Sequence, residues 1–270
     1  MSILPSGPTR VPVAVRTAAG ALGRWYPVAV VLLAWEALSR SGLVSHRLVP
    51  GLADIAQAFA ANMASGDIPF HAGISLGRAL SGFGLAIAAG VALGVLMARV
   101  RWVESVFEPV FSFGYPVPKI ALYPIFIFVF GLGSLSKVAL IFLECLYPIT
   151  VNTYFGIQSV DRKHLWSARN MGASPAQVFW RVLLPSAGPS IFSGLRVGLP
   201  ISLIVVIITE MIGESRGLGY YISYATASFE FASAYAGVLA IAAIGFVLDR
   251  LLIFIRNRII FWERISGAYA

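Results

Sequence analysis

The chain has 270 residues, of which 58% are hydrophobic and only 12% are charged. Soluble globular domains carry about a quarter charged residues, so this composition excludes an ordinary soluble domain and indicates a membrane protein. The formal net charge of +8 would suit a nucleic-acid binder, but the basic residues gather at one set of ends of the apolar segments. That distribution sets orientation in a membrane, and we expect no nucleic-acid partner.

Long apolar runs predict about six transmembrane helices, because a helix needs about 20 apolar residues to cross the hydrocarbon core. Lipid cannot satisfy backbone polar groups, so each segment must satisfy its own, and the short alternating strands of a barrel are not visible. The fold class is therefore predicted as all-α and polytopic, with a cytoplasmic arm over residues 1–24, a membrane domain over 25–260 and a tail over 261–270. The spans are expected near 25–41, 79–99, 113–131, 136–156, 189–212 and 234–256.

Most of the twenty Lys and Arg residues fall on one side of the membrane in this arrangement. Positive residues mark the cytoplasmic face, so both termini and the loop over residues 160–187 are predicted to be cytoplasmic. The residues on this side are Arg10, Arg16, Arg24, Arg99, Arg101, Arg162, Lys163, Arg169, Arg181, Arg250, Arg256, Arg258 and Arg264.

After the first span, residues 42–72 form an outer segment in which Leu52–Ala64 has helical spacing. The second span then carries small residues at every fourth position, which create a smooth stripe where another helix backbone can approach closely. The stripe predicts a buried helix seam, either within the subunit or between subunits. Its members are Gly82, Ala86, Gly90, Gly94 and Ala98.

The third span is interrupted by prolines, with Pro116, Pro118 and Pro124 surrounding Lys119. Proline removes an amide donor and kinks a helix. Two interpretations stay open here: a kinked helix along a pathway, or a bend that precedes the span proper.

Ionisable residues inside spans are costly in lipid and are candidates for a solute or ion pathway. Lys119, Glu144, Arg196 and Glu210 are the pathway candidates, and Glu36 lies near a span end. For Glu210 the alternative is a structural hydrogen bond in the protein interior. The acids Glu36, Glu144 and Glu210 also leave open an ion-coupled carrier that moves protons or other ions.

No catalytic residue or metal site is predicted. Cys145 is the only cysteine, which excludes a cysteine metal cluster. The phosphate-binding pattern of P-loop ATPases is missing, so ATP hydrolysis would have to take place in another protein. We expect neither an enzyme nor a cofactor bound to this chain.

The loop between the fourth and fifth spans is much longer than a simple connection and carries Arg162, Lys163, Arg169 and Arg181. Its pattern predicts a short amphipathic helix over Arg162–Asn170, a break at Gly172, and a second helix over Ala176–Leu184 that leads to Pro185. Ser174 and Pro175 suit the start of that helix, as cap and first residue. The small-residue tip at Gly172 and Ala173 would fit a groove in another protein.

This loop resembles the signature of permease subunits of bacterial ABC importers, which reads E-A-A, three residues, Gly, nine residues, then I-x-L-P. Gly172 matches its glycine, Ala168 its third position, and Val182, Leu184 and Pro185 its end. Trp166 and Ser167 stand where the family usually has Glu and Ala. The segments Pro116–Pro124, Phe130–Gly133, Gly194–Arg196 and Glu210–Gly219 resemble the nitrate, sulfonate and taurine branch.

The resemblance implies a MetI-like type I importer core that works as a homodimer in the bacterial inner membrane. Two copies of a cytoplasmic ATPase, which bind ATP and Mg²⁺, would dock on the loop, and an extracytoplasmic solute-binding protein would deliver the solute. Lys119, Glu144, Arg196 and Glu210 would border the path. The coupling helix to the ATPase would comprise Leu165, Trp166, Ser167, Ala168, Arg169, Asn170, Met171, Gly172 and Ala173.

The resemblance leaves the solute open. A small anion such as nitrate, a sulfonate or taurine is expected first, and an aromatic carboxylate or a thiamine-precursor pyrimidine is the alternative within the same family.

Overall fold

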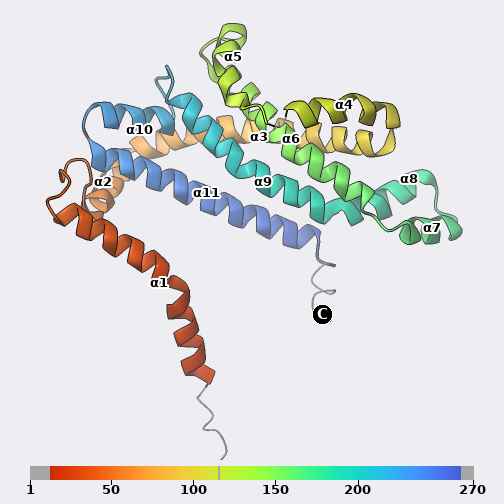
Figure 1. Cartoon of the computed structure of the whole chain (residues 1–270), viewed down its shortest axis with the longest axis horizontal. Helices are drawn as coiled ribbons and strands as arrows, with labels where there is room; N and C mark the ends of the chain where they lie inside the picture. Colours follow the sequence, from red (N-terminus) through yellow and green to blue (C-terminus); the bar gives the residue numbers. More distant parts are fainter. Residues whose placement is uncertain (1–12, 115, 263–270) are drawn as a thin grey trace, which may run out of the picture.

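The computed structural model describes residues 13–114 and 116–262, with side chains from Tyr26 onward. These residues are mainly helical and contain no β-strand, which confirms the all-α prediction. Four long helices run side by side and form the bundle (Figure 1): α3 (Asp67–Arg99), α6 (Ser134–Gln158), α9 (Leu184–Glu210) and α11 (Phe231–Ile259). Each is apolar and long enough to cross a membrane, with α9 counted from Pro175.

Shorter helices close the two ends of the bundle. One end carries α2 (Leu52–Ser65) and α10 (Leu218–Ala227), and the other carries α7 (Arg162–Asn170) and α8 (Pro175–Val178) (Figure 1). Helices were predicted over 52–64 and 162–170, and both are confirmed.

The first predicted span falls in α1 (Val13–Arg40), which leaves the bundle and points away from it (Figure 1). The predicted cytoplasmic arm lies outside the described residues as far as residue 12, including Arg10, and the backbone is helical from Val13. Most of the predicted tail, with Arg264, also lies outside them.

The span predicted near 113–131 is not one straight helix. The chain instead forms α4 (Arg101–Gly114), a 3₁₀ turn η1 (Lys119–Leu122) and α5 (Tyr123–Phe130), and the two parts are bent by 91°. Pro116 and Pro118 lack amide donors and restrict the residues before them, so a straight helix cannot pass this point. Counted as one broken span, this pair would be a fifth crossing among the described residues.

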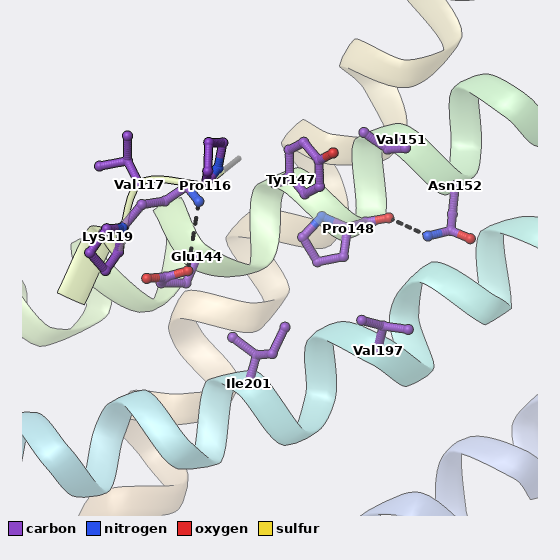
Figure 2. Close-up of a pocket in the computed structure, with 11 residues that line it drawn as sticks. Pro116, Val117, Lys119, Glu144, Tyr147, Pro148, Val151, Asn152, Val197 and Ile201 are labelled. Carbon is purple, nitrogen blue, oxygen red and sulfur yellow. Dashed lines mark hydrogen bonds and ion pairs between the residues drawn. The ribbon is translucent and has the colours of Figure 1, made fainter. Parts of the chain in front are cut away.

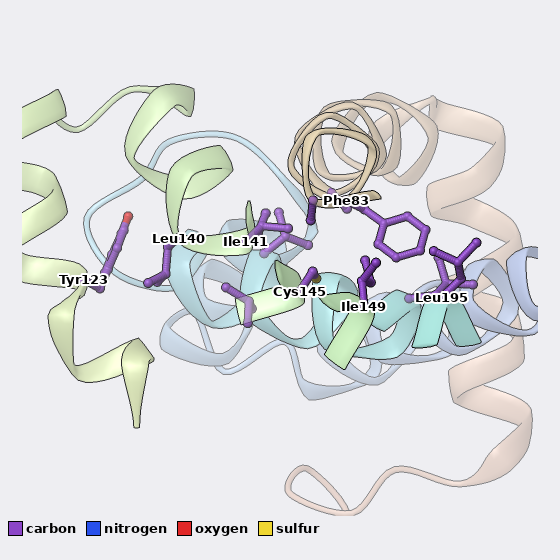
Figure 3. Close-up of a cluster of buried hydrophobic side chains, with 12 residues drawn as sticks. Phe83, Tyr123, Leu140, Ile141, Cys145, Ile149 and Leu195 are labelled. Carbon is purple, nitrogen blue, oxygen red and sulfur yellow. The ribbon is translucent and has the colours of Figure 1, made fainter. Parts of the chain in front are cut away.

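Helix α6 lies at the centre of the core, between α3 and α9 (Figure 3). The glycine stripe of α3 faces α6: a Cβ on Gly82 would stand 2.7 Å from Ile141, and one on Gly94 would stand 2.6 Å from Thr153. Real side chains do not approach so closely, so these positions require glycine. The predicted seam is therefore present, and it lies within the chain.

The second helix of the long loop, predicted over Ala176–Leu184, does not end before Pro185. After α8 the chain makes a π-helical turn, η2 (Phe179–Leu183), and continues directly into α9. The π turn interrupts the regular α-helical hydrogen bonding directly before Pro185, which has no amide donor.

Candidate functional site

The α7–α8 loop (residues 160–187) is built by two capped helices around a glycine turn. Asp161 caps α7 by accepting from the Lys163 amide at 2.8 Å, and Ser174 caps α8 by accepting from the Gln177 amide at 3.3 Å. Gly172 has φ +84°, a left-handed conformation that favours glycine, and a Cβ there would meet nothing within 4 Å. The tip is therefore a defined turn with open space around it.

Apolar contacts fix the base of the loop to the bundle. Ala168 and Val178 are buried, and Leu165 and Phe179 pack against a cluster formed by Ile157, Leu183 and Ala187. The predicted motif end lies in this base, with Val182 in η2 and Leu184 and Pro185 at the start of α9. The base thus ties the loop to α6 and α9.

The outer surface of the loop combines basic and large apolar side chains. Arg162, Lys163 and Arg169 are exposed, and none of them forms an ion pair within the described part of the chain. Trp166 is 59% exposed and Met171 80% exposed. Burying such side chains releases water from apolar surface, so this surface is suited to contact with another molecule.

A pocket of about 460 Å³ opens between the turn before η1 and the helices α6 and α9 (Figure 2). Lys119 and Glu144 point toward each other across it, with 4.0 Å between Nζ and Oε2. Their side chains are only 16% and 19% exposed. The remaining wall is mostly apolar, with contributions from Pro148, Val151, Val197 and Ile201. Small-molecule sites typically have this size and this mixture of apolar wall and few charges.

A second, smaller pocket of about 200 Å³ lies next to the first, because Tyr147 and Val151 line both. It also contains Glu108 of α4 and Tyr154 of α6. The Tyr154 hydroxyl donates a short hydrogen bond to Glu104. The residues 144, 147, 151 and 154 follow helical spacing, so one face of α6 lines both pockets.

The end of the bundle that carries α10 holds a buried ion cluster: Ser75, Arg78, Lys137, Glu210 and Glu214. Glu210 is fully buried and accepts from Ser75 Oγ at 2.6 Å, from Arg78 at 2.9 Å and from the Gly219 amide at 3.1 Å. Lys137 is also fully buried and pairs with Glu214 at 2.5 Å. The cluster links α3, α6 and α9 to the segment that leads into α10.

Two pathway candidates meet in the pocket and two lie elsewhere. Lys119 and Glu144 face each other, whereas Glu210 lies in the buried ion cluster and Arg196 is an exposed side chain that pairs with Asp249 of α11 at 3.1 Å. Glu36 accepts from the Leu52 amide at 3.0 Å and pairs with Arg40, so it anchors the start of α2.

Sequence reasoning did not identify the partners of Glu210. The sequence does carry a signal for these partners: Arg78 and Lys137 lie in or next to apolar segments, where a charged side chain requires an oppositely charged partner. No group of three or more His, Cys, Asp or Glu side chains within residues 26–114 and 116–262 is arranged to hold a metal ion.

Comparison with known proteins extends these observations. The family described as "binding-protein-dependent transport system inner membrane component" matches residues 90–261. The chain is 33% identical over 193 residues to the taurine transport system permease protein TauC of Escherichia coli, covering 72% of this chain and 70% of that one. It is 34% identical over 191 residues to the formylaminopyrimidine transport permease protein ThiX of Halalkalibacterium halodurans, covering 71% and 74%.

The fold is also similar to a solved structure, the MetNI methionine ABC transporter in inward-facing conformations. The TM-score is 0.52 at 20% identity, and the match covers 69% of this chain and 91% of that chain. At this identity the likeness concerns the arrangement of helices.

Proposed function

The chain belongs to the family of binding-protein-dependent transport system inner membrane components, and from that premise we propose that it couples solute import to ATP hydrolysis in a separate ATPase docked on the α7–α8 loop. It is a multi-pass transport permease of the ABC importer type rather than an enzyme. The proposed assembly contains two copies of this chain, two ATPase subunits that bind ATP and Mg²⁺, and an extracytoplasmic binding protein.

The observation that carries the proposal is the α7–α8 loop. Its tip is open and its base is packed against α6 and α9, so a force applied at the tip reaches two long helices of the bundle. ATP binding and hydrolysis in the partner would move the loop and rock these helices as rigid bodies. Residues Leu165–Ala173 are proposed as the contact segment.

The proposed orientation places the α7–α8 end in the cytoplasm. The exposed basic residues of the loop are at this end, together with Arg256 and Arg258 near the end of α11. An excess of Lys and Arg in short loops marks the cytoplasmic side. The buried ion cluster and α10 would then lie on the opposite side, where the binding protein delivers its solute, and the N-terminus would be cytoplasmic.

We propose that the solute passes along the pocket that contains Lys119 and Glu144. The ammonium of Lys119 supports a solute with an anionic group, and the relatives include a taurine permease. The resemblance to a formylaminopyrimidine permease supports the alternative solute, a pyrimidine. Solute choice would also depend on the binding protein.

The test is ATP-driven uptake by cells or proteoliposomes that contain this chain, its ATPase and its binding protein. Gly172→Arg should abolish uptake and capture of the ATPase, because a long side chain at the tip blocks insertion, while the variant remains folded. Gly114→Arg is a control, since Gly114 lies outside the loop and a Cβ there also meets nothing within 4 Å. Uptake that persists without the ATPase would reject the proposal and favour the ion-coupled carrier.

A further inference from the structure

The pocket between η1, α6 and α9 holds one positive and one negative side chain, and this arrangement bears on the chemistry of the solute. We propose that Lys119 and Glu144 form a two-point binding site for a small zwitterion, a molecule with an acidic group and an amino group a few bonds apart. The inference rests on the proposed transport function and deepens it by naming a solute class and the residue that binds each end.

The geometry of the pair differs from that of a structural ion pair in the same protein. In the buried ion cluster, Arg78 and Glu210 are 2.9 Å apart and Lys137 and Glu214 are 2.5 Å apart. Lys119 and Glu144 are 4.0 Å apart, both line the cavity, and both keep part of their surface exposed to it (Figure 2). Their charges are close enough to neutralise each other and far enough apart to admit other partners.

Charge balance favours a zwitterion over an ion of one sign. A simple anion that binds Lys119 would place its charge beside Glu144, and a partly buried site strengthens that repulsion. A simple cation would meet the same problem at Lys119. A zwitterion adds no net charge and offers each side chain an opposite partner, so neither is left desolvated and unpaired.

The surroundings strengthen the requirement for a positive group on the solute. Tyr147 places its ring 5.7 Å from Lys119 Nζ, within the range of a cation–π contact, and so holds the ammonium at the pocket wall. The adjoining pocket adds the carboxyl of Glu108 and, through Tyr154, contact with Glu104. Among the residues that line the two pockets, the acids Glu108 and Glu144 outnumber Lys119, which disfavours a bare anion.

Binding of three probes to the purified chain in lipid nanodiscs tests the inference without an ATPase or a binding protein. The probes are taurine, ethanesulfonate, which lacks the amino group, and ethylammonium, which lacks the acid. Saturation-transfer NMR titrations give a Kd for each. We expect taurine to bind at least tenfold more tightly than either single-charge probe.

Two variants assign the ends of the solute. Glu144→Gln should weaken the binding of taurine and strengthen the binding of ethanesulfonate, so that the two probes have similar Kd values. Lys119→Gln should likewise bring the Kd values of taurine and ethylammonium together. Arg40→Gln and Glu230→Gln remove charges outside the pocket and should leave all three Kd values within twofold. If the pair were purely structural, each substitution would change the Kd values of all three probes by a similar factor.

Equal binding of taurine and ethanesulfonate by the wild-type chain would overturn the inference, as would binding of none of the probes or a Glu144→Gln variant that keeps the preference. These results would leave the proposed coupling to an ATPase intact, because that function is tested by uptake and by capture of the partner. Conversely, if uptake did not depend on the ATPase but the chain still preferred taurine, the proposed coupling would be rejected and this inference would stand.

Discussion

Charged side chains are buried and paired at the end of the bundle that carries α10, and exposed at the end that carries α7. The first group comprises Arg78, Lys137, Glu210 and Glu214, in a network that joins three long helices. The second comprises Arg162, Lys163 and Arg169, which share one sign and form no ion pair within the described residues. Charges neutralised within the chain hold the fold together, whereas unneutralised charges are available to a partner.

The pocket pair lies between these extremes. Lys119 and Glu144 are mostly buried, as in the cluster, but loosely paired and open to a cavity. Each of the three sites therefore predicts a different response to substitution. The single Cys145 is fully buried, so its reaction with a thiol-reactive dye reports unfolding, and this assay serves the stability comparisons at neutral pH below.

The largest loss of stability is expected from Arg78→Met, which leaves the carboxylate of Glu210 buried without its cation. Breaking a buried pair in this way costs about 3–5 kcal/mol. The double variant Arg78→Met/Glu210→Met should recover much of the loss, because two apolar side chains of similar size need no ionic partner. Thermal unfolding of the detergent-solubilised chain, followed through Cys145, measures both.

The matched control for this prediction is Arg40→Met, which breaks an exposed pair with Glu36 at the end of α1. Exposed pairs contribute about 0–1 kcal/mol, so this variant should resemble the wild type. If Arg78→Met were as stable as Arg40→Met, the buried ion cluster would not stabilise the fold as its burial indicates.

A comparison of two glycines sharpens the contrast at a somewhat smaller scale. Gly217 and Gly172 both have positive φ, but a Cβ on Gly217 would stand 2.2 Å from the Glu210 carboxyl carbon, whereas a Cβ on Gly172 meets nothing within 4 Å. Gly217→Ala should lose about 1–3 kcal/mol of stability through overpacking, in addition to the loss caused by backbone strain. Gly172→Ala carries only that strain, about 1–2 kcal/mol.

The same unfolding assay compares the two alanine variants. Equal losses would mean that the side chains around Gly217 move aside freely, and the close approach of Gly217 to Glu210 would not restrict substitution at the α10 end. Gly172→Ala should also retain more ATPase coupling than Gly172→Arg, because a methyl group adds little volume at the tip.

Charge reversal in the loop should change partner binding and not stability. Arg162→Glu/Arg169→Glu places acids on an exposed surface and should weaken capture of the ATPase at least tenfold, which corresponds to about 1.4 kcal/mol. The reason is that the loop lacks an acidic side chain from Arg162 to Gln177, so the partner groove is expected to be acidic. Binding is measured in nanodiscs of neutral lipid, because anionic lipids also attract basic segments.

Arg258→Glu is the control for the loop variant, since it reverses an exposed charge at the same end but on α11. Wild-type ATPase affinity for the double loop variant, or an equal loss in Arg258→Glu, would show that the loop charges do not contact the partner. Raising the salt concentration should weaken the wild-type complex more than the double variant complex.

Most of the helices could be predicted from the sequence because local signals define them. Apolar runs of sufficient length located α3, α6, α9 and α11, and the Ser174–Pro175 pair located the start of α8. The glycine stripe located the seam on α3, because only small residues permit close backbone approach. These signals lie within a few residues of the feature that they determine.

Features that depend on helix rotation and on distant contacts could not be predicted. Arg78 and Glu210 are 132 residues apart, and their pairing requires the relative placement of α3 and α9. The bend after Gly114 was signalled by prolines, but its direction depends on what α5 packs against. Lys119 and Glu144 were recognised as pathway candidates, while their meeting across one pocket followed only from the structure.

The smallest effect is expected from pH at the α10 end. Burial alone would raise the pKa of Glu214, but the neighbouring Lys137 and Arg78 outweigh it and hold the pKa of this carboxyl below its usual value. A depressed pKa in the folded state contributes stability above the unfolded pKa, and this contribution is lost as the pH falls through the folded pKa. Glu214→Gln should therefore be less stable than the wild type at pH 7, and the difference should shrink in acid.

Unfolding followed through a thiol dye works poorly in acid, so this comparison uses intrinsic tryptophan fluorescence over pH 3–7 in one detergent. Glu230→Gln, which removes an exposed carboxyl near the same end, should give a stability difference that stays small throughout. A Glu214→Gln difference that grows as the pH falls would mean that the paired cations do not stabilise the ionised form. The charges at the α10 end would then, like those at the α7 end, not be stabilised by partners within the chain. The two ends would not differ in the way that their ion pairs indicate.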